Sequence, residues 1–373
     1  MSKIFIASLK LGSGHLMAAQ AIAEALARDH AAVEVKRVDF LDNAPVLPRI
    51  LYGYTYNQIV PKWPELYGYF YNKYKSFEPL SRPRWPWSRL STLSFFTELD
   101  DYNPDLVIAT HFIAAGALVD YRARKKLNFP ILFPTTDYEI HPLLKVSGVD
   151  YYCVQTDEMK SHLQSLGVPA ARISITGIPV RLAFTQNKDK AALQEKYKLK
   201  PNEPTVLLMA GGFGLMPLDH VVADVLQSKQ KFQLIIVCGR HHQFYESMLK
   251  LQATDERLKL VFEFIPFIDE LMALADFMVA KPGGSIVSES LAMALPMLLV
   301  EPVPGQEDAN VEYLLENGAA IKARHKESLM FKLSYLLDHP EKLQEMREAI
   351  KKIARADAAR TVADLACEII KQS

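Results

Sequence analysis

A histidine near the start of the chain sits in a motif that suits proton transfer. Gly12-Ser13-Gly14-His15 follows a short apolar run and comes directly before a stretch with helical periodicity. Glycines at such a junction allow a tight turn and a close approach of the backbone to a ligand. An imidazole in the first turn of the helix is well suited to accept a proton near neutral pH. Taken alone, the motif also fits a structural histidine.

A second glycine cluster, Gly211-Gly212-Phe213-Gly214, follows the apolar run 205–210. Glycines between a strand and a helix commonly cradle phosphate groups, although a tight turn is the simpler alternative. The cluster matches neither the G-x-x-x-x-G-K-[ST] loop of nucleotide triphosphatases nor the spacing of a dinucleotide fingerprint. We therefore expect contact with phosphate here without triphosphate hydrolysis.

The segment 281–285 is the most informative of the motifs. Its sequence is KPGGS, and a predicted helix over 286–295 follows it. The unpaired N–H groups and the dipole of a helix N-terminus can bind a diphosphate without a metal. Glu289 lies one turn into this helix on the face of Ser285, where it can accept hydrogen bonds from ribose hydroxyls. A solvent-facing Glu289 is the alternative.

A fourth motif, 302–310, combines rigid and polar residues. Its sequence is PVPGQEDAN, and it follows the apolar run 297–300. Adjacent amide and carboxylate side chains on a Pro-Gly loop suit the neighbouring hydroxyls of a sugar. A plain loop that enters a helix, with Glu307 or Asp308 as a first-turn acid, is the alternative.

Composition sets the class of protein. The chain has 373 residues, of which 49% are hydrophobic and 23% charged, which is typical of a globular protein with two domains. Basic and acidic residues number 43 each, so net charge supplies no argument for nucleic acid. Cys153, Cys238 and Cys367 form no C-x-x-C spacing, which disfavours a zinc site and indicates a reducing compartment. No uncharged stretch reaches the about 20 residues of a membrane-spanning helix, so we expect a soluble cytoplasmic protein.

Short apolar runs alternate with helical patterns along the chain, which predicts parallel sheets flanked by helices. One series of strand candidates lies between residues 4 and 154, and a second lies between 205 and 300. The polar segment 185–204 separates them, and we place the domain boundary there. Two doubly wound domains bind ligands at the carboxyl ends of their strands, and in a cleft between them if the domains face each other.

Residues 49–96 depart from the rest of the chain in composition. They hold all three tryptophans, seven of the sixteen tyrosines, and seven basic residues against two acidic ones. Tryptophan and tyrosine favour the membrane–water interface, and a basic residue near an anionic surface contributes about 1 kcal/mol. Either an interfacial surface or an aromatic-rich insertion that packs on its own domain fits this composition.

In order along the chain, these motifs resemble those of the diacylglycerol glycosyltransferases. That family includes monogalactosyldiacylglycerol synthase and the bacterial processive diacylglycerol glucosyltransferases. The pair KPGGS…E and PGQE…N is its most specific signature here. Three further stretches match as well: Gly177-Ile178-Pro179-Val180, Cys238-Gly239-Arg240 and Thr136-Asp137-x-x-x-His141.

The resemblance implies a GT-B fold, an α/β architecture of two facing Rossmann-like domains with the ligand cleft between them. Residues 1–184 would form the acceptor and membrane-facing domain, and 185–355 would bind the UDP-sugar. The C-terminal helix, about 356–373, would return to the first domain. The implied activity is inverting transfer of a hexose from a UDP-sugar to a lipid acceptor, most directly diacylglycerol. Residues 49–96 would then bind an anionic membrane surface, peripherally.

The resemblance also assigns roles. His15 would be the base near the acceptor, and Asp137 would orient or assist it. Arg240 would lie near uracil or the diphosphate, Glu289 on ribose, and the loop after residue 303 on the hexose. The full set of residues expected to contact the donor is Gly14, Gly212, Phe213, Gly214, Arg240, Gly283, Gly284, Ser285, Glu289, Gln306, Glu307 and Asn310. No D-x-D sequence occurs, so we expect no metal, and helix dipoles would stabilise the leaving diphosphate.

Three other functions stay open. The acceptor could be a polyprenyl-linked sugar, the chain could be a UDP-N-acetylglucosamine 2-epimerase, or it could be a nucleotide-sugar sensor without activity. The aromatic and basic segment argues against the epimerase, and His15 with Asp137 argues against the sensor. Leu143 and Phe213 depart from residues common in the family, and the sequence does not identify the hexose.

Overall fold

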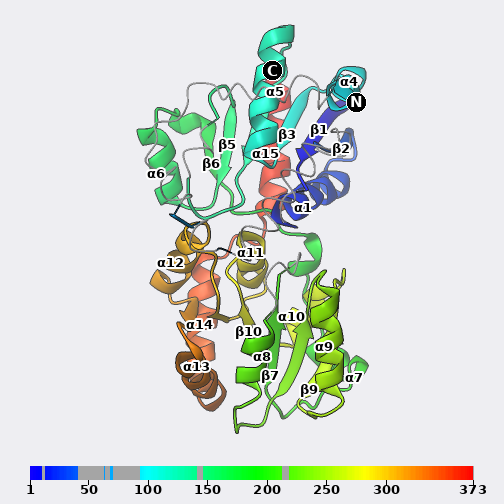
Figure 1. Cartoon of the computed structure of the whole chain (residues 1–373). Helices are drawn as coiled ribbons and strands as arrows, with labels where there is room; N and C mark the ends of the chain where they lie inside the picture. Colours follow the sequence, from blue (N-terminus) through cyan, green and yellow to red (C-terminus); the bar gives the residue numbers. More distant parts are fainter. Residues whose placement is uncertain are drawn as a thin grey trace. The chain divides into compact units, whose positions relative to one another are not determined.

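The computed structural model describes residues 1–10, 13–40, 63, 68–69, 93–140, 146–211 and 218–372. The chain forms two compact units (Figure 1). Unit 1 contains residues 1–182 and 355–373, and unit 2 contains residues 183–354. The sequence places the boundary after residue 184 and the return of the chain near residue 356.

Unit 1 is built on a parallel sheet in the order β2-β1-β3-β4-β5-β6. Its strands are β1 (Ser2–Ser8), β2 (Val33–Asp39), β3 (Leu106–Ala109), β4 (Ile131–Pro134), β5 (Tyr151–Val154) and β6 (Ile173–Ile175). Its helices are α1 (Ser13–Asp29), α4 (Leu93–Tyr102), α5 (Phe112–Lys125), α6 (Asp157–Ser165) and α15 (Ala358–Gln372).

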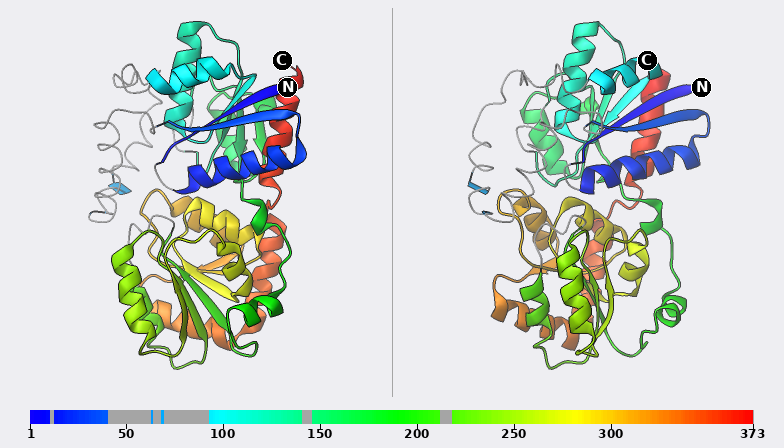
Figure 2. Two further views of the ribbon diagram at one scale, coloured as in Figure 1. Left: turned by 90° about the vertical axis from the view of Figure 1, so that its right-hand side faces the viewer. Right: turned by 45° about the vertical axis from the view of Figure 1, so that its right-hand side comes forward.

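Alternate residues of these strands fill two different cores, because successive side chains of a strand point to opposite faces. Ile4 and Ile6 of β1 pack with α1 and α15 on one face. Phe5 and Ala7 pack with α4 and α5 on the other. Figure 2 shows α15, in red, beside α1, in blue, and the two helices are in contact. The C-terminal helix is therefore an integral part of the first core, although 172 residues of unit 2 precede it in the chain.

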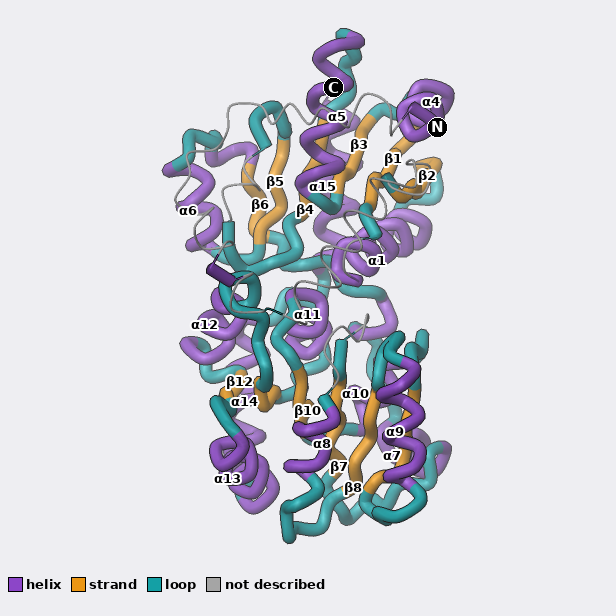
Figure 3. Tube along the Cα trace, in the orientation of Figure 1, coloured by secondary structure: helices purple, strands orange, loops and turns teal. Residues whose placement is uncertain are grey.

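Unit 2 repeats this architecture with a parallel sheet in the order β12-β11-β10-β7-β8-β9. Its strands are β7 (Thr205–Met209), β8 (Gln233–Val237), β9 (Leu258–Phe262), β10 (Phe277–Ala280), β11 (Met297–Leu299) and β12 (Ala320–Lys322). Its helices are α7 (Lys190–Lys196), α8 (Asp219–Val225), α9 (His242–Gln252), α10 (Ile268–Leu274), α11 (Gly284–Ala292), α12 (Asp308–Glu316), α13 (Lys326–Asp338) and α14 (Pro340–Ile353). Figure 3 shows the strands of each unit side by side with helices around them. The prediction of doubly wound parallel sheets is confirmed.

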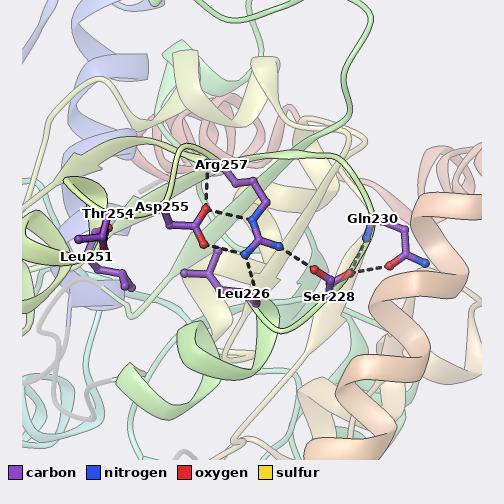
Figure 4. A network of polar contacts seen from close by, with 7 residues as sticks. All are labelled: Leu226, Ser228, Gln230, Leu251, Thr254, Asp255 and Arg257. Carbon is purple, nitrogen blue, oxygen red and sulfur yellow. Dashed lines mark hydrogen bonds and ion pairs between the residues drawn. The ribbon is translucent and has the colours of Figure 1, made fainter.

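A network of hydrogen bonds holds the amino edge of the second sheet (Figure 4). Arg257, directly before β9, donates to both carboxylate oxygens of Asp255 and to the carbonyl oxygens of Leu226 and Ser228. These bonds tie the end of α8 to the start of β9. They leave the opposite, carboxyl edge of the sheet to the loops that carry the motifs.

None of the described helices combines the length and the apolar character needed to cross a membrane.

Gly177 marks the place where the C-terminal segment returns to unit 1. Its φ is +82°, and a Cβ atom built on it would lie 2.5 Å from the Cβ of Arg355. Gly167 has a similar φ of +88°, but no atom lies within 4 Å of the position of its Cβ. Backbone strain is therefore comparable at the two glycines, and the steric clash is specific to Gly177.

We expect Gly177→Ala to lower the free energy of unfolding by about 1–3 kcal/mol more than Gly167→Ala, because only the first displaces the segment before α15. Thermal unfolding of the two variants measures this difference. Equal losses of stability would mean that the segment at Arg355 adjusts without cost.

Candidate active site

The motifs lie at the topological switch point of each sheet. In unit 1 the chain leaves β1 in one direction toward β2 and later crosses to β3 on the other side of β1. In unit 2 the same switch occurs between β7 and β10. Connections diverge at such a point, so a crevice opens at the carboxyl ends of the two strands and ligands bind there. His15 follows β1, and the segment 281–285 follows β10.

Three hydrogen bonds fix His15 at the first switch point. Its Nδ1 lies 2.6 Å from the carbonyl oxygen of Thr110, the residue after β3. The hydroxyl of Thr136, which follows β4, lies 3.0 Å from the same nitrogen. The Thr110 hydroxyl in turn donates to the backbone carbonyl of His15, at 3.0 Å. The loops after three neighbouring strands therefore meet at one imidazole.

These partners determine the tautomer of His15. A carbonyl oxygen can only accept, so Nδ1 of His15 carries the proton and Nε2 keeps its lone pair. Burial of the ring lowers the pKa of His15 to about 4, although the hydrogen bond to Thr110 acts in the opposite direction. His15 is therefore neutral at pH 7, with an unprotonated Nε2 that can serve as a base.

A second histidine, His111, adjoins His15 and is buried. The ring centroids of His111 and His15 are 4.4 Å apart, in an edge-to-face arrangement. His111 caps the N-terminus of α5, and its Nδ1 accepts a hydrogen bond from the backbone N–H of Ile113 at 3.1 Å. Burial, with a smaller contribution from His15, holds the pKa of His111 well below its ordinary value.

The structure describes some, but not all, of the residues that the sequence motifs predict for the site in unit 1. Gly14 and His15 lie in the first turn of α1, and Asp137 is half-buried directly after Thr136. Gly12 and His141 lie outside the described residues. The role of Asp137 as an assistant to the base stays a prediction.

Thr110, His111 and Thr136 surround His15, and sequence analysis gives none of them a role, although Thr136 opens the Thr136-Asp137-x-x-x-His141 stretch that matches the family. Each follows a short buried strand, Leu106–Ala109 or Ile131–Pro134, as one of its first polar residues. That position at the carboxyl edge was the available signal. It becomes informative only when the strand order is known.

At the second switch point, α11 begins at the glycine pair. Gly283 is the N-cap residue, and no side chain caps this helix, so Ser285 does not have the capping role that the motif allows. Ser285 lies half-buried in the first turn. Glu289 is only 8% exposed, which rules out the solvent-facing alternative. Its contact with ribose stays a prediction.

Asn310, in the first turn of α12, joins this helix to the loop after β10, and Glu307 lies close to the same loop. The amide nitrogen of Asn310 donates to the carbonyl oxygen of Pro282 at 2.8 Å, and Asn310 is 0% exposed. Glu307 Oε1 lies 3.4 Å from the position that a Cβ on Gly283 would take. The other oxygen of Glu307 accepts from the backbone N–H of Val303 at 2.7 Å. Both side chains thus shape the loops.

The hexose contacts expected from Gln306, Glu307 and Asn310 stay predictions. Gln306 and Glu307 are half-buried. Asn310 donates from its N–H₂ group to the carbonyl oxygen of Pro282.

Lys281 places a buried amino group at this site. It directly follows β10 and is 7% exposed. Burial lowers the pKa of Lys281, whereas the nearby carboxylates of Glu307 and Glu301 raise it. A protonated Lys281 adds positive potential beside the N-terminus of α11, which favours an anionic ligand there.

Arg240 lies at the carboxyl end of β8, after Gly239. Its guanidinium carbon is 4.9 Å from the ring centroid of Phe264, and both side chains are exposed. Phe264 belongs to none of the motifs. The expected phosphate contacts Gly212, Phe213 and Gly214 lie outside the described residues, and Gly211 before them has a φ of +85°.

Within the described part of the chain, no three or more His, Cys, Asp and Glu side chains come together in a way that could hold a metal ion.

Comparisons with known proteins link both units to glycosyltransferases. The family model "Monogalactosyldiacylglycerol (MGDG) synthase" matches residues 15–180, and "Glycosyltransferase family 28 C-terminal domain" matches residues 205–362. The processive diacylglycerol beta-glucosyltransferase of Bacillus mycoides is 30% identical over 364 residues, which cover 97% of this chain and 92% of that protein.

Solved structures establish the fold class. MurG of Acinetobacter baumannii superposes with a TM-score of 0.62 at 18% identity, over 99% of this chain and 100% of that one. The S. aureus MnaA–UDP structure gives a TM-score of 0.65 at 15% identity, over 100% of this chain and 97% of that one. These likenesses bear out the prediction of a GT-B fold.

The Asn310–Pro282 bond leads to a test of stability. Asn310→Asp removes the donor and buries a carboxylate beside a carbonyl oxygen, so we expect a loss of about 2–3 kcal/mol in the free energy of unfolding. Asn317 is the matched control, because its amide also donates to a carbonyl oxygen, that of Tyr313, at 2.8 Å, but it is only half-buried. Denaturant unfolding of both Asn→Asp variants is the measurement. A loss at Asn310 no larger than at Asn317 would show that the tie between the loops is weak.

Proposed function

The chain belongs to the diacylglycerol glycosyltransferase family that includes the monogalactosyldiacylglycerol synthases and the processive diacylglycerol glucosyltransferases, and from this membership we propose that it transfers a hexose from a UDP-sugar to the hydroxyl of diacylglycerol with inversion at the anomeric carbon. The relatives are named beta-glucosyltransferases, so UDP-glucose is the first donor to test.

The geometry of His15 is the observation that carries this proposal. Inversion needs one base to take the proton of the acceptor hydroxyl as its oxygen attacks the anomeric carbon. The hydrogen bond of Nδ1 to Thr110 leaves the lone pair of Nε2 for that proton. The bond between the anomeric carbon and the diphosphate oxygen breaks in the same step, and its electron pair leaves with UDP.

The residues after β10 would stabilise the departing UDP. Gly283 and Gly284 open α11, whose N–H groups and dipole favour the two phosphates, and a protonated Lys281 would add a buried positive charge. Glu289 is the expected ribose contact. We propose that these groups replace a divalent metal ion in the reaction.

We further propose that the protein acts peripherally at the cytoplasmic face of a membrane. Diacylglycerol is insoluble, so the enzyme must reach it at a lipid surface. Within the segment 49–96, Trp63 and Tyr69 are 59% and 61% exposed, which supports a role of aromatic side chains at the interface. The rest of the tryptophans, Trp85 and Trp87, lie outside the described residues.

Release of UDP from a panel of UDP-hexoses tests the proposed function, with vesicles that contain or lack diacylglycerol, and with EDTA in parallel. We expect release that requires one UDP-hexose and diacylglycerol and that continues in EDTA. Release only with a polyprenyl-linked acceptor, or interconversion of UDP-sugars without any acceptor, would assign the chain to one of the alternatives. Binding of UDP-hexose without turnover would indicate a sensor, and loss of activity in EDTA would contradict the metal-free mechanism.

The pKa of His15 sets the pH dependence that we expect. Because Nε2 is protonated only near pH 4 in the free enzyme, kcat/KM should stay level from pH 8 to about 5 and fall about tenfold per unit below about 4. An acid limb centred near 6.5, the ordinary pKa of histidine, would contradict this. His15→Ala should lower kcat about 100-fold or more and leave the affinity for UDP nearly intact.

Stability must be followed alongside this profile. The unfolded chain binds a proton at His15 near pH 6.5, and the folded chain binds it only near pH 4. The free energy of unfolding therefore decreases as the pH falls between these values. Circular dichroism at each pH separates loss of the fold from protonation of the base.

Membrane attachment can be tested on the tryptophans. Replacement of Trp63, Trp85 and Trp87 by Ser should reduce cosedimentation with anionic vesicles, because each indole that leaves water at the interface contributes to binding. The control is the Phe331→Ser variant, which removes a 70% exposed aromatic residue of α13 outside the segment. Unchanged sedimentation of the triple variant would place the lipid contact elsewhere.

A further inference from the structure

His111, the neighbour of the proposed base His15, has packing contacts in addition to the hydrogen bond by which it caps α5. Its Nδ1 accepts from the N–H of Ile113, and its ring stacks on that of Phe112 with a centroid distance of 4.5 Å. Ala114, Ala115 and Leu118 bury one face of α5 in the first core. The position of the His111 ring is thus determined by the packing of a whole helix.

The hydrogen bonds give the two rings opposite tautomers. A backbone N–H can only donate, so Nδ1 of neutral His111 has no proton and Nε2 carries it. Neutral His15 has its proton on Nδ1 instead, because Thr110 accepts there. The pair therefore contains one lone pair without a hydrogen bond to a described residue, on Nε2 of His15, and the neutral ring of His111 lies with its centroid 4.4 Å from that of His15.

Several features disfavour a positive charge on both histidines at once. His111 is only 5% exposed, and burial disfavours a buried imidazolium. Both histidines stand at the positive ends of helices, His15 in the first turn of α1 and His111 at the start of α5. A proton on one ring also repels a proton on the other. The pair accepts one proton at most, and the free lone pair on His15 receives it.

We propose, on the basis of the function proposed above, that His111 is a positioning residue for the base: it fixes the orientation of the His15 ring and stays neutral while His15 takes the proton of the acceptor. The other titratable residues on the described segments that follow β1 and β4 are Lys10 after β1, and Asp137, Tyr138 and Glu139 after β4. His111 is the one in ring contact with His15.

The variant His111→Asn tests this role and preserves the cap. An asparagine oxygen accepts from the first-turn N–H groups of a helix as well as any side chain does, so α5 keeps its cap. The His15 ring, in contrast, loses the ring of His111 that it contacts. We expect kcat to fall about 10- to 100-fold because the base is no longer oriented, with unchanged KM for the donor. The acid limb of kcat/KM should move to higher pH because water reaches the imidazole.

A second variant, His111→Asp, keeps the cap and adds a charge. Its carboxylate would stabilise a protonated His15, so the acid limb should move further toward neutral pH than in His111→Asn.

The matched control is His325→Asn. His325 is also an N-cap residue, that of α13, but its exposed Nδ1 lies 2.9 Å from Oε2 of Glu327 as well as 3.3 Å from the backbone nitrogen of Ser328. The same substitution at this position should leave kcat and the pH profile as they are in the unchanged protein. If His111→Asn and His325→Asn both leave them unchanged, His111 is only a helix cap and the proposal is wrong.

The proposal can also be tested without turnover. ¹⁵N NMR of the unchanged protein should find the proton of His111 on Nε2, and a proton on Nδ1 would overturn the pairing even if both variants fail to fold. Absence of hexose transfer by the unchanged protein would instead contradict the proposed function. In that case, NMR titration of His15 still tests the role of His111, because the titration midpoint of His15 should be higher in His111→Asn than in the unchanged protein.

Discussion

The hydrogen bond between Nδ1 of His15 and the carbonyl oxygen of Thr110 is the interaction on which the proposed chemistry depends. It joins the helix after β1 to the loop after β3 across 95 positions of the sequence. It also decides which nitrogen is the base, since an imidazole that donates at Nδ1 has its lone pair at Nε2. The strand order places β1 beside β3. The reactive state of a single side chain thus follows from the topology of the sheet.

The second unit has a switch point of the same kind, but different residues lie there. Its switch point lies between β7 and β10, where glycines and a helix N-terminus replace the histidines of unit 1. Asn310 ties the start of α12 to Pro282, and Glu307 lies close to Gly283. In the proposed function, His15 of the first unit would accept the proton and the N-terminus of α11 in the second would bind the diphosphate, which are two elements that inverting transfer from a nucleotide-sugar requires.

The sequence predicted what depends on local pattern. Alternating apolar runs and helical periods predicted the parallel sheets, and the glycine motifs marked the starts of α1 and α11. It could not predict contacts that depend on strand order, because no local signal places β3 beside β1. Thr110 and His111 were therefore missed, although they touch His15. Burial was also beyond local pattern: the sequence does not reveal that the Asn310 amide lies inside the fold, bonded to Pro282, and its expected contact with the sugar stays a prediction.

The protonation of His15 is the central claim, and ¹⁵N NMR titration of its imidazole in the folded protein tests it most directly. The account predicts a proton on Nδ1, a lone pair on Nε2, and a titration midpoint near 4. A proton on Nε2 at neutral pH would contradict it, because the lone pair would then face the Thr110 carbonyl and no base would be available. A midpoint near 6.5 would contradict the burial that keeps this histidine neutral.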